Sequence, residues 1–217
     1  MALEISTLIF DMDGVIVDTE PIHVEAELLT CNNFGIEAPL SEWENFKGRT
    51  AKDIFTYLRD NFGNKEIDVN KLIDYKLKIY YQIAKEKARL IDGAFGFIKK
   101  AAEKYELALT TSSLKVLQEL MFQKFSLDKF FNIIETGDEI INGKPDPEPY
   151  LKTVAKLKIP AETCLVIEDS DNGIISGKKA GCKVAGITTS FERKKLEKAG
   201  ADYVVDSFQE LANILNL

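Results

Sequence analysis

The chain has 217 residues, of which 45% are hydrophobic and 29% charged. This length and composition suit one large or two small globular domains, and they exclude a mainly disordered, collagen-like or coiled-coil chain. With 28 Lys and Arg against 35 Asp and Glu, the chain carries a net charge of −7. Such a surface repels phosphate backbones and anionic membranes. We therefore expect a small-molecule partner, and neither a nucleic-acid nor a membrane partner.

The three cysteines, Cys31, Cys164 and Cys182, lie in separate apolar segments without a CxxC pair or a neighbouring histidine. We expect them to be buried free thiols, as in a reducing compartment. No signal peptide is visible at the N-terminus, and no apolar stretch reaches the length of a membrane span. These features predict a cytoplasmic protein, which we expect to be a monomer.

Short apolar segments alternate with helical patterns along most of the chain. Residues 4–10 are β-branched and apolar and stop abruptly at Asp11, which indicates a buried parallel strand with a functional loop at its end. Helical patterns lie over 94–104 and around 116–121 and 150–155. Further strands are expected at 106–111, 132–135, 163–167, 183–187 and 203–205. The alternation predicts an α/β fold with a Rossmann-like, doubly wound parallel sheet.

Residues 19–88 interrupt this alternation with helical patterns and no strand. Pro21 opens the first helix, with Asp18 or Thr19 as its N-cap; a second helix follows Thr50, and 69–84 carries the clearest apolar stripe. The insertion falls directly after the first strand. We therefore expect an inserted α-helical cap, residues 19–88, and an α/β core made of residues 1–18 and 89–217. Two chain crossings would join them, which suits a hinged lid.

Two pairs of carboxylates are expected at one edge of the sheet. Asp11 and Asp13 follow the first strand, and residues i and i+2 of an extended chain point to the same side. Glu168 and Asp169 follow the strand at 163–167. Ligands bind open α/β folds at this carboxyl edge. The alternative for the first pair is an acidic turn facing solvent, and for the second a turn that begins like a capping box. Because neighbouring carboxylates repel each other, the first pair indicates Mg²⁺ or one acid and one base.

A hydroxyl motif and a lysine motif lie between these pairs. Thr111, Ser112 and Ser113 lie at the end of the second strand, where hydroxyls and free N–H groups can bind an anion, although a helix N-cap suffices to explain them alone. Lys144 stands in Gly-Lys-Pro-Asp-Pro (143–147), whose last two residues suit the N-cap and first position of a helix. Most lysines are merely exposed, but one held at a helix start can reach an anion. Four such motifs, each at or just beyond a strand end, are improbable by chance.

With these motifs in this order, the sequence resembles the haloacid dehalogenase superfamily of phosphoryl-transfer enzymes. Residues 11–21 are similar to the opening motif of its phosphatase and β-phosphoglucomutase branch. Residues 143–147 and 168–170 match its later motifs. The resemblance covers essentially the whole chain, and that branch carries a small helical cap where residues 19–88 lie.

The resemblance implies a role for each motif residue. Asp11 would be the nucleophile that forms an aspartyl-phosphate, and Asp13 would be the general acid and then the general base. Thr111 and the backbone N–H of Ser112 would hold the phosphoryl group. Lys144 would bridge that group and the nucleophile.

The same resemblance implies Mg²⁺ as the cofactor. Asp11, Asp169 and the Asp13 carbonyl would bind the ion, and Glu168 would assist through water. A carboxylate that approaches a phosphate monoester is an anion meeting an anion, so Mg²⁺ and Lys144 must offset the repulsion. Covalent capture divides one difficult hydrolysis into two steps, and closure of a cap would exclude bulk water.

Substrate choice is expected to lie in the cap. In the loop 46–50, Gly48 beside Arg49 suits the close approach of an anionic or hydroxyl-rich ligand. An ordinary loop followed by Thr50 as an N-cap is an equal alternative. His23 is the single histidine and lies near the expected hinge, where that branch often has a histidine. We therefore take His23, Gly48, Arg49 and Thr50 as candidate substrate residues.

The resemblance, together with these motif residues, implies a Mg²⁺-dependent phosphatase that hydrolyses a small phosphorylated metabolite such as a sugar phosphate. The alternative is a β-phosphoglucomutase, which shares the site but needs a cationic group in the cap. In the mutases an arginine lies three residues after the cap glycine, whereas this chain has Ala51 there and Arg49 beside Gly48, which favours the phosphatase. A receiver-like phospho-switch is disfavoured by the motif order and the insertion. A catalytically inactive relative is disfavoured because every motif residue is present.

Overall fold

The computed structural model describes residues 5–46 and 50–217, which divide into two compact units. The core unit comprises the chain up to Asp18 together with Arg89–Leu217, and the helical unit comprises Thr19–Ala88. The described residues of the helical unit contain helices and no strand. No helix within the two described ranges is long and apolar enough to cross a membrane.

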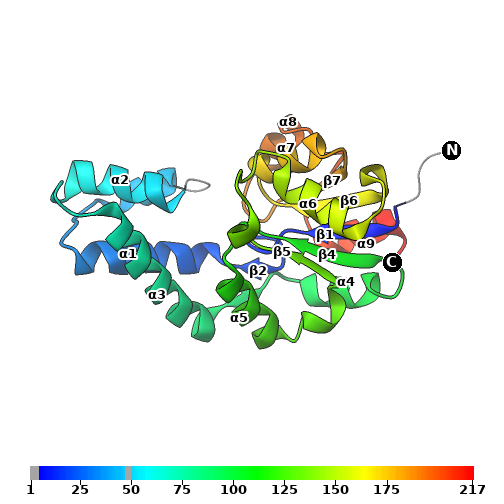
Figure 1. The fold of residues 1–217 in the computed structure, drawn as a ribbon, viewed down its shortest axis with the longest axis horizontal. Coiled ribbons are helices and arrows are strands. Elements are labelled where there is room, and N and C mark those ends of the chain that lie inside the picture. Colours follow the sequence, from blue (N-terminus) through cyan, green and yellow to red (C-terminus); the bar gives the residue numbers. More distant parts are fainter. Residues whose placement is uncertain (1–4, 47–49) are drawn as a thin grey trace. The chain divides into compact units, whose positions relative to one another are not determined.

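A six-stranded parallel sheet organises the core unit (Figure 1). Its spatial order is β5-β4-β1-β6-β7-β8, so the chain builds outward from β1 to one edge and then returns to build the other half. The predicted doubly wound α/β fold is therefore confirmed. The change of direction falls between β1 and β6, where open α/β folds bind ligands. The strands are β1 (Thr7–Phe10), β4 (Glu106–Thr110), β5 (Ile133–Glu135), β6 (Cys164–Glu168), β7 (Lys183–Ile187) and β8 (Tyr203–Val205).

Helices cover both faces of this sheet, and Figure 1 shows α6, α7 and α8 on one side with α4 and α5 on the other. The first group is α6 (Glu148–Leu157), α7 (Asp171–Lys179) and α8 (Arg193–Lys198). The second group is α4 (Ala94–Ala101), α5 (Lys115–Phe125) and α9 (Phe208–Leu215). Short 3₁₀ turns, η2 (Asp128–Phe130), η3 (Gly137–Glu139) and η4 (Ala161–Thr163), lie in the connections.

The central strand β1 is buried on both faces, which explains its unbroken apolar sequence. Ile9 packs into a cluster with Tyr150 of α6 and Ile174 of α7. The next residue, Phe10, faces the opposite layer, where its ring meets those of Phe97 and Phe131 edge to face. The two layers therefore clamp β1 and fix the direction in which the chain leaves it.

The helical unit has an apolar core of its own. It consists of α1 (Glu20–Asn33), the 3₁₀ turn η1 (Leu40–Asn45), α2 (Ala51–Phe62) and α3 (Val69–Lys87). Its centre holds the buried side chains of Trp43, Phe46, Phe55, Leu58 and Leu72. These residues belong to the aromatic and apolar positions of residues 19–88, so the insertion can fold around its own side chains.

A small two-stranded antiparallel sheet, which sequence reasoning missed, lies where the chain leaves the core for the insertion and returns from it. Its strands are β2 (Val17–Asp18) and β3 (Arg89–Leu90), with Val17 opposite Leu90 and Asp18 opposite Arg89. Two-residue strands are too short to show any periodicity, so the sequence offered no signal for them.

Several predicted boundaries need correction. The first strand begins at Thr7 rather than at residue 4. The strand predicted at 163–167 is β6, which extends to Glu168. Helix α6 begins at Glu148 with Pro147 as its N-cap, not with Asp146 as N-cap. The carboxylate of Asp146 accepts a hydrogen bond from the Glu148 N–H at 2.9 Å, so it forms an Asx turn just ahead of the helix.

Candidate active site

Three carboxylates meet at the carboxyl edge of the sheet, at the change of strand direction. Asp11 follows β1, Glu168 ends β6, and Asp169 follows it. Because Phe10 pairs with Ile167, the next residues, Asp11 and Glu168, come to lie side by side. One oxygen of each of the three carboxylates lies within 4.8 Å of the others, and all three residues are buried. The sequence prediction that strand ends bring these groups together is thus met by the geometry.

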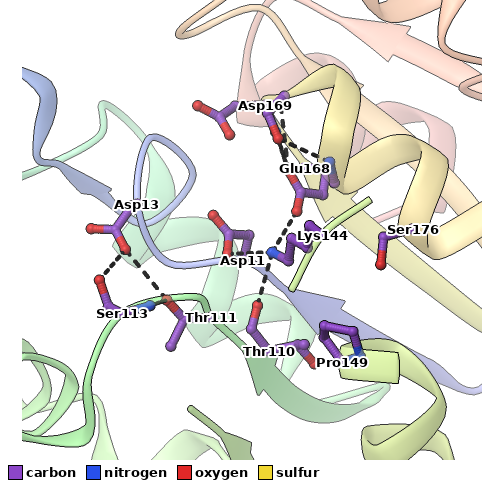
Figure 2. Close-up of polar contacts among 12 residues, drawn as sticks. Asp11, Asp13, Thr110, Thr111, Ser113, Lys144, Pro149, Glu168, Asp169 and Ser176 are labelled. Atoms are coloured by element: carbon purple, nitrogen blue, oxygen red, sulfur yellow. Dashed lines mark hydrogen bonds and ion pairs between the residues drawn. The ribbon is translucent and has the colours of Figure 1, made fainter. Parts of the chain in front are cut away.

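Lys144 is the cation at the centre of this cluster (Figure 2). Its ammonium group donates to Asp11 Oδ1 at 2.7 Å and to Glu168 Oε1 at 2.6 Å, and it also reaches the Thr110 carbonyl at 3.3 Å. The lysine side chain is only 8% exposed. Burial disfavours its charge, but the carboxylates of Asp11 and Glu168 outweigh that effect and hold its pKa above the usual value. Lys144 is therefore charged at neutral pH.

The cluster nevertheless carries surplus negative charge, with three carboxylates around one lysine. Burial raises the pKa of Asp11 well above its usual value, in spite of Lys144, and the neighbouring carboxylates add to the effect. Burial likewise raises the pKa of Asp169 to about 7, and Glu168 adds to this. A hard divalent cation bound by oxygen ligands would remove the conflict. The residues present therefore fit a magnesium-type site.

Glu168 differs from the other two carboxylates because both of its oxygens already have donors. Oε1 accepts from Lys144 and from the Tyr150 hydroxyl at 2.7 Å, and Oε2 accepts from the Ser170 hydroxyl at 3.0 Å and the Asp169 N–H at 3.2 Å. These bonds fit an indirect role in metal binding better than direct ligation. Tyr150, which sequence reasoning did not single out, is fully buried beside Lys144, whose ammonium lies 5.1 Å from its ring centre.

Asp13 belongs to a separate group of hydrogen bonds. Its Oδ2 accepts from the Ser113 hydroxyl at 2.7 Å and from the Thr111 hydroxyl at 3.3 Å. Figure 2 shows this carboxylate turned toward Thr111 and Ser113, while Asp11 faces Lys144. The chain turns immediately after β1, because the N–H groups of Ile16 and Val17 both donate to the Met12 carbonyl. The expected extended pair of carboxylates is therefore a bent pair with two different sets of partners.

Two glycines make room for the carboxylates. Gly14 has a φ of +75°, and a Cβ atom at this position would overlap with the Asp169 carboxylate. A Cβ atom on Gly173, in the first turn of α7, would overlap with the carboxyl group of Glu168. The turn after β1 and the start of α7 thus approach the acidic cluster as closely as the backbone permits.

The predicted phosphate-binding residues lie beside this cluster. Thr111 directly follows β4, and its N–H donates to the Glu135 carbonyl of β5 at 3.0 Å. Together with Ser112 it forms one wall of a small pocket of about 110 Å³. The other residues that line the pocket are Gly137, Ile140, Gly143 and Pro149.

The candidate substrate residues of the insertion have different surroundings. The side chain of Thr50 caps α2, accepting from the Asp53 N–H at 3.1 Å and donating to its carboxylate at 2.7 Å. Gly48 and Arg49 lie outside the described residues. The structure therefore gives Thr50 the capping role that was the alternative interpretation of this loop.

His23, itself half-buried, belongs to a cluster within the helical unit whose other members, Glu27, Lys76 and Tyr80, are buried. Its Nδ1 lies 2.8 Å from the ammonium of Lys76, which is also 3.7 Å from a Glu27 carboxylate oxygen. The His23 and Tyr80 rings have centroids 4.5 Å apart. Sequence reasoning missed this set, although each pair, His23 with Glu27 and Lys76 with Tyr80, has the i, i+4 spacing of one helix face.

With this geometry in place, comparison with known proteins identifies the class. Residues 8–187 match the family model of the haloacid dehalogenase-like hydrolases, and the chain belongs to this family. The resemblance stated from the motifs is thus confirmed. The assignment leaves no place for the receiver-domain alternative.

Individual relatives match along nearly the whole chain. The phosphorylated carbohydrates phosphatase of Thermotoga maritima is 30% identical, covering 96% of this chain and 97% of its own. The pyrophosphatase PpaX of Bacillus cereus (strain B4264) is 25% identical, covering 99% and 98%. The crystal structure of a putative β-phosphoglucomutase from Thermotoga maritima is similar with a TM-score of 0.83 and 27% identity, covering 98% and 99%.

Proposed function

We propose that the protein is a phosphoric monoester hydrolase that removes phosphate from a small phosphorylated metabolite, such as a sugar phosphate, through an aspartyl-phosphate on Asp11. The observation that carries this proposal is the contact of Lys144 with Asp11 inside a buried surplus of carboxylates. A nucleophile held by a cation beside a cation-binding edge suits attack on an anionic ester.

The first step uses Asp11 as the nucleophile and Asp13 as the acid. A carboxylate oxygen of Asp11 forms a bond to phosphorus while the bond from phosphorus to the ester oxygen breaks. Asp13 donates its proton to that leaving oxygen, which departs as an alcohol. Lys144, whose ammonium already contacts Asp11 Oδ1, orients the nucleophile and offsets the repulsion between the two anions.

The second step releases inorganic phosphate. Asp13, now ionised, takes a proton from a water molecule as the water oxygen attacks phosphorus, and the bond between phosphorus and Asp11 breaks. The hydroxyl of Thr111 and the N–H of Ser112 hold the phosphoryl oxygens in both steps. The second step returns to Asp13 the proton that the first step removed, so Asp11 and Asp13 end the cycle unchanged.

Magnesium is the cofactor that the acidic cluster fits. Asp11, Asp169 and the Asp13 carbonyl would hold the ion, and Glu168 would act through water, since its own oxygens already accept hydrogen bonds. When bound, magnesium supplies positive charge beside the transferring phosphoryl group. The buried surplus charge on these carboxylates is what supports its presence.

The group that accepts the phosphoryl group from Asp11 separates the alternatives. Similarity to a phosphorylated carbohydrates phosphatase supports sugar phosphates, whereas the similar solved structure of a putative β-phosphoglucomutase makes a mutase the second candidate. At the position where mutases carry an arginine, this chain has Ala51, the first residue of α2. We therefore expect water, rather than a sugar hydroxyl, to take the phosphoryl group.

The test is a panel of sugar phosphates, other alkyl phosphates and pyrophosphate, scored for phosphate released in the presence of Mg²⁺. β-Glucose 1-phosphate is also scored for glucose 6-phosphate with a trace of bisphosphate. We expect phosphate from sugar phosphates, and a loss on the order of 10⁶-fold in kcat for Asp11→Asn, because an amide is a poor nucleophile. The exposed Asp128→Asn serves as the matched control. Substantial activity in Asp11→Asn, or glucose 6-phosphate with little phosphate, would overturn the proposal.

A further inference from the structure

Two hydroxyl groups share a single oxygen of Asp13. Ser113 donates to Oδ2 at 2.7 Å and Thr111 donates to the same atom at 3.3 Å. Figure 2 draws both hydrogen bonds. The other oxygen, Oδ1, is buried and has no hydrogen-bond partner among residues 5–46 and 50–217. The carboxylate therefore has one anchored oxygen and one unoccupied oxygen.

Thr111 cannot remain bound to Asp13 while it serves the substrate. A hydroxyl has one proton to donate, and in this structure the Thr111 proton points to Asp13. The Thr111 oxygen already accepts from the Ser113 N–H at 3.0 Å, which leaves the proton as the group that can reach a phosphoryl oxygen. When Thr111 turns to the phosphate, as the proposed function requires, Asp13 loses that donor.

Ser113 has no such conflict and is held firmly in place. Its N–H bonds to Thr111, and its carbonyl accepts from the Gly137 N–H at 2.9 Å. A Cβ atom on Gly137 would overlap with the Ser112 carbonyl, so the two segments are in close contact. The backbone on both sides of the Ser113 side chain is thus fixed, and its short hydrogen bond to Asp13 is the stronger of the two.

We propose that Ser113 is the positioning residue for proton transfer, holding Asp13 by Oδ2 so that Oδ1 delivers and then accepts the catalytic proton. This inference rests on the proposed function, because it assumes that Asp13 is the acid and base. It assigns the first and third residues of the Thr-Ser-Ser segment to separate tasks: Thr111 serves the phosphate and Ser113 serves Asp13.

The experiment compares Ser113→Ala with wild type on two esters. The leaving group of a nitrophenyl phosphate departs as the stable nitrophenolate anion and needs no proton, whereas the leaving group of an alkyl phosphate departs as an alkoxide unless Asp13 protonates it. For the alkyl ester we expect kcat to fall by about 10-fold to 10²-fold with little change in KM. For the nitrophenyl ester we expect a normal burst of nitrophenolate, followed by slow turnover, because the second step also needs Asp13. Ser113→Thr, which retains a hydroxyl, should recover most of the alkyl-ester rate.

Controls separate positioning from stability and from the proposed function. Ser207→Ala removes the hydroxyl that caps α9 in the same unit, so it should lower the melting temperature without changing the ratio of alkyl to nitrophenyl rates. Equal slowing of the nitrophenyl burst and the alkyl rate in Ser113→Ala would overturn the role of Ser113 alone. Wild-type turnover of the alkyl ester by Asp13→Asn would instead overturn the proposed function, and the inference with it.

Discussion

The two units of this protein each bury a group of charged side chains, and the two groups differ in whether positive and negative charges balance. In the core unit, the acidic cluster of Asp11, Glu168 and Asp169 has three carboxylates, and Lys144 forms ion pairs with the first two. In the helical unit, the histidine cluster of His23, Glu27, Lys76 and Tyr80 pairs one carboxylate with one ammonium.

Histidine adds no charge to the second cluster. Burial lowers the pKa of His23 to about 3, with a further contribution from Lys76, so the ring is neutral at physiological pH. The histidine cluster is therefore balanced within its own unit, whereas the acidic cluster is not. Buried charge is costly unless it is paired. The excess of carboxylates over ammonium groups, and not burial itself, therefore marks the place where a cation is needed.

The largest effect is expected for Lys144→Met, which leaves the acidic cluster with no cation of its own. We expect unfolding free energy in EDTA to fall by about 3–5 kcal/mol, and kcat to fall on the order of 10²–10³-fold. Urea unfolding with and without Mg²⁺ measures the first, and part of the lost stability should return with Mg²⁺. Lys178→Met is the matched control. Because its ion pair with Asp202 is about one-third exposed, we expect a loss of about 1 kcal/mol or less in unfolding free energy. A similar loss in both variants would contradict the distinction.

Lys76→Met breaks the balance of the histidine cluster instead. It leaves the buried Glu27 without its ion-pair partner, and we expect a loss of about 3 kcal/mol in unfolding free energy. Because Glu27 is here the carboxylate paired with the ammonium of Lys76, and no group of metal-ligand carboxylates is found around it among the described residues, Mg²⁺ should restore none of the loss. A second substitution, Glu27→Gln, should recover part of it in a double-mutant cycle. Recovery of the single variant by Mg²⁺ would show that the two clusters do not differ as described.

In contrast to the two lysine substitutions, Asp169→Asn should raise the unfolding free energy of the metal-free protein. The pKa of Asp169 is about 7 in the folded state, above its unfolded value, so the folded protein holds an extra proton between these values. Stability in EDTA therefore falls as pH rises from about 4 to 7, and the asparagine variant escapes this loss. We expect it to gain at least about 1 kcal/mol at pH 8 and to lose most of the melting-temperature rise that Mg²⁺ produces in wild type. A variant less stable than wild type in EDTA at pH 8 would contradict the surplus-charge argument.

The smallest effect is expected for His23→Gln and appears as a change in pH slope. The pKa of His23 is about 3 when folded, below the unfolded value of about 6.5, so the unfolded chain binds a proton that the folded one does not. Wild-type stability from this group is present above about pH 6.5 and is lost as pH falls toward 3. The difference in unfolding free energy between variant and wild type should therefore change with pH in this window. If unfolding free energy depends on pH in the same way in wild type and in His23→Gln, this prediction is wrong.

Sequence patterns predicted the sheet and the residues at its edge because both depend on local signals. A short apolar run that ends in Asp11, and another that ends in Glu168 and Asp169, indicates strand ends, and parallel strands bring their ends together. The glycine–lysine–proline run likewise marked Lys144. Residue type and position along one strand were sufficient in each case.

Other contacts were missed because they depend on how distant segments approach each other. Ser113 reaches Asp13 from 100 residues away, and Tyr150 reaches Glu168 from a different helix. The candidate substrate residues of the insertion were harder to predict, because Thr50 has a local capping role that its sequence position equally allowed. Hydroxyl groups have many local uses, and only the folded chain selects one of them.

The two-stranded sheet of β2 and β3 makes the helical unit a replaceable module. Asp18 and Arg89 are direct partners across the two strands, and neighbouring strands lie about 4.8 Å apart. A two-residue turn can join antiparallel strands at this point, so the sheet could close on itself without Thr19–Ala88. Genetic exchange at these two codons would leave every strand end of the core in place. The same carboxyl edge can thereby be combined with insertions of very different size, and selection on the insertion can proceed independently of selection on the sheet.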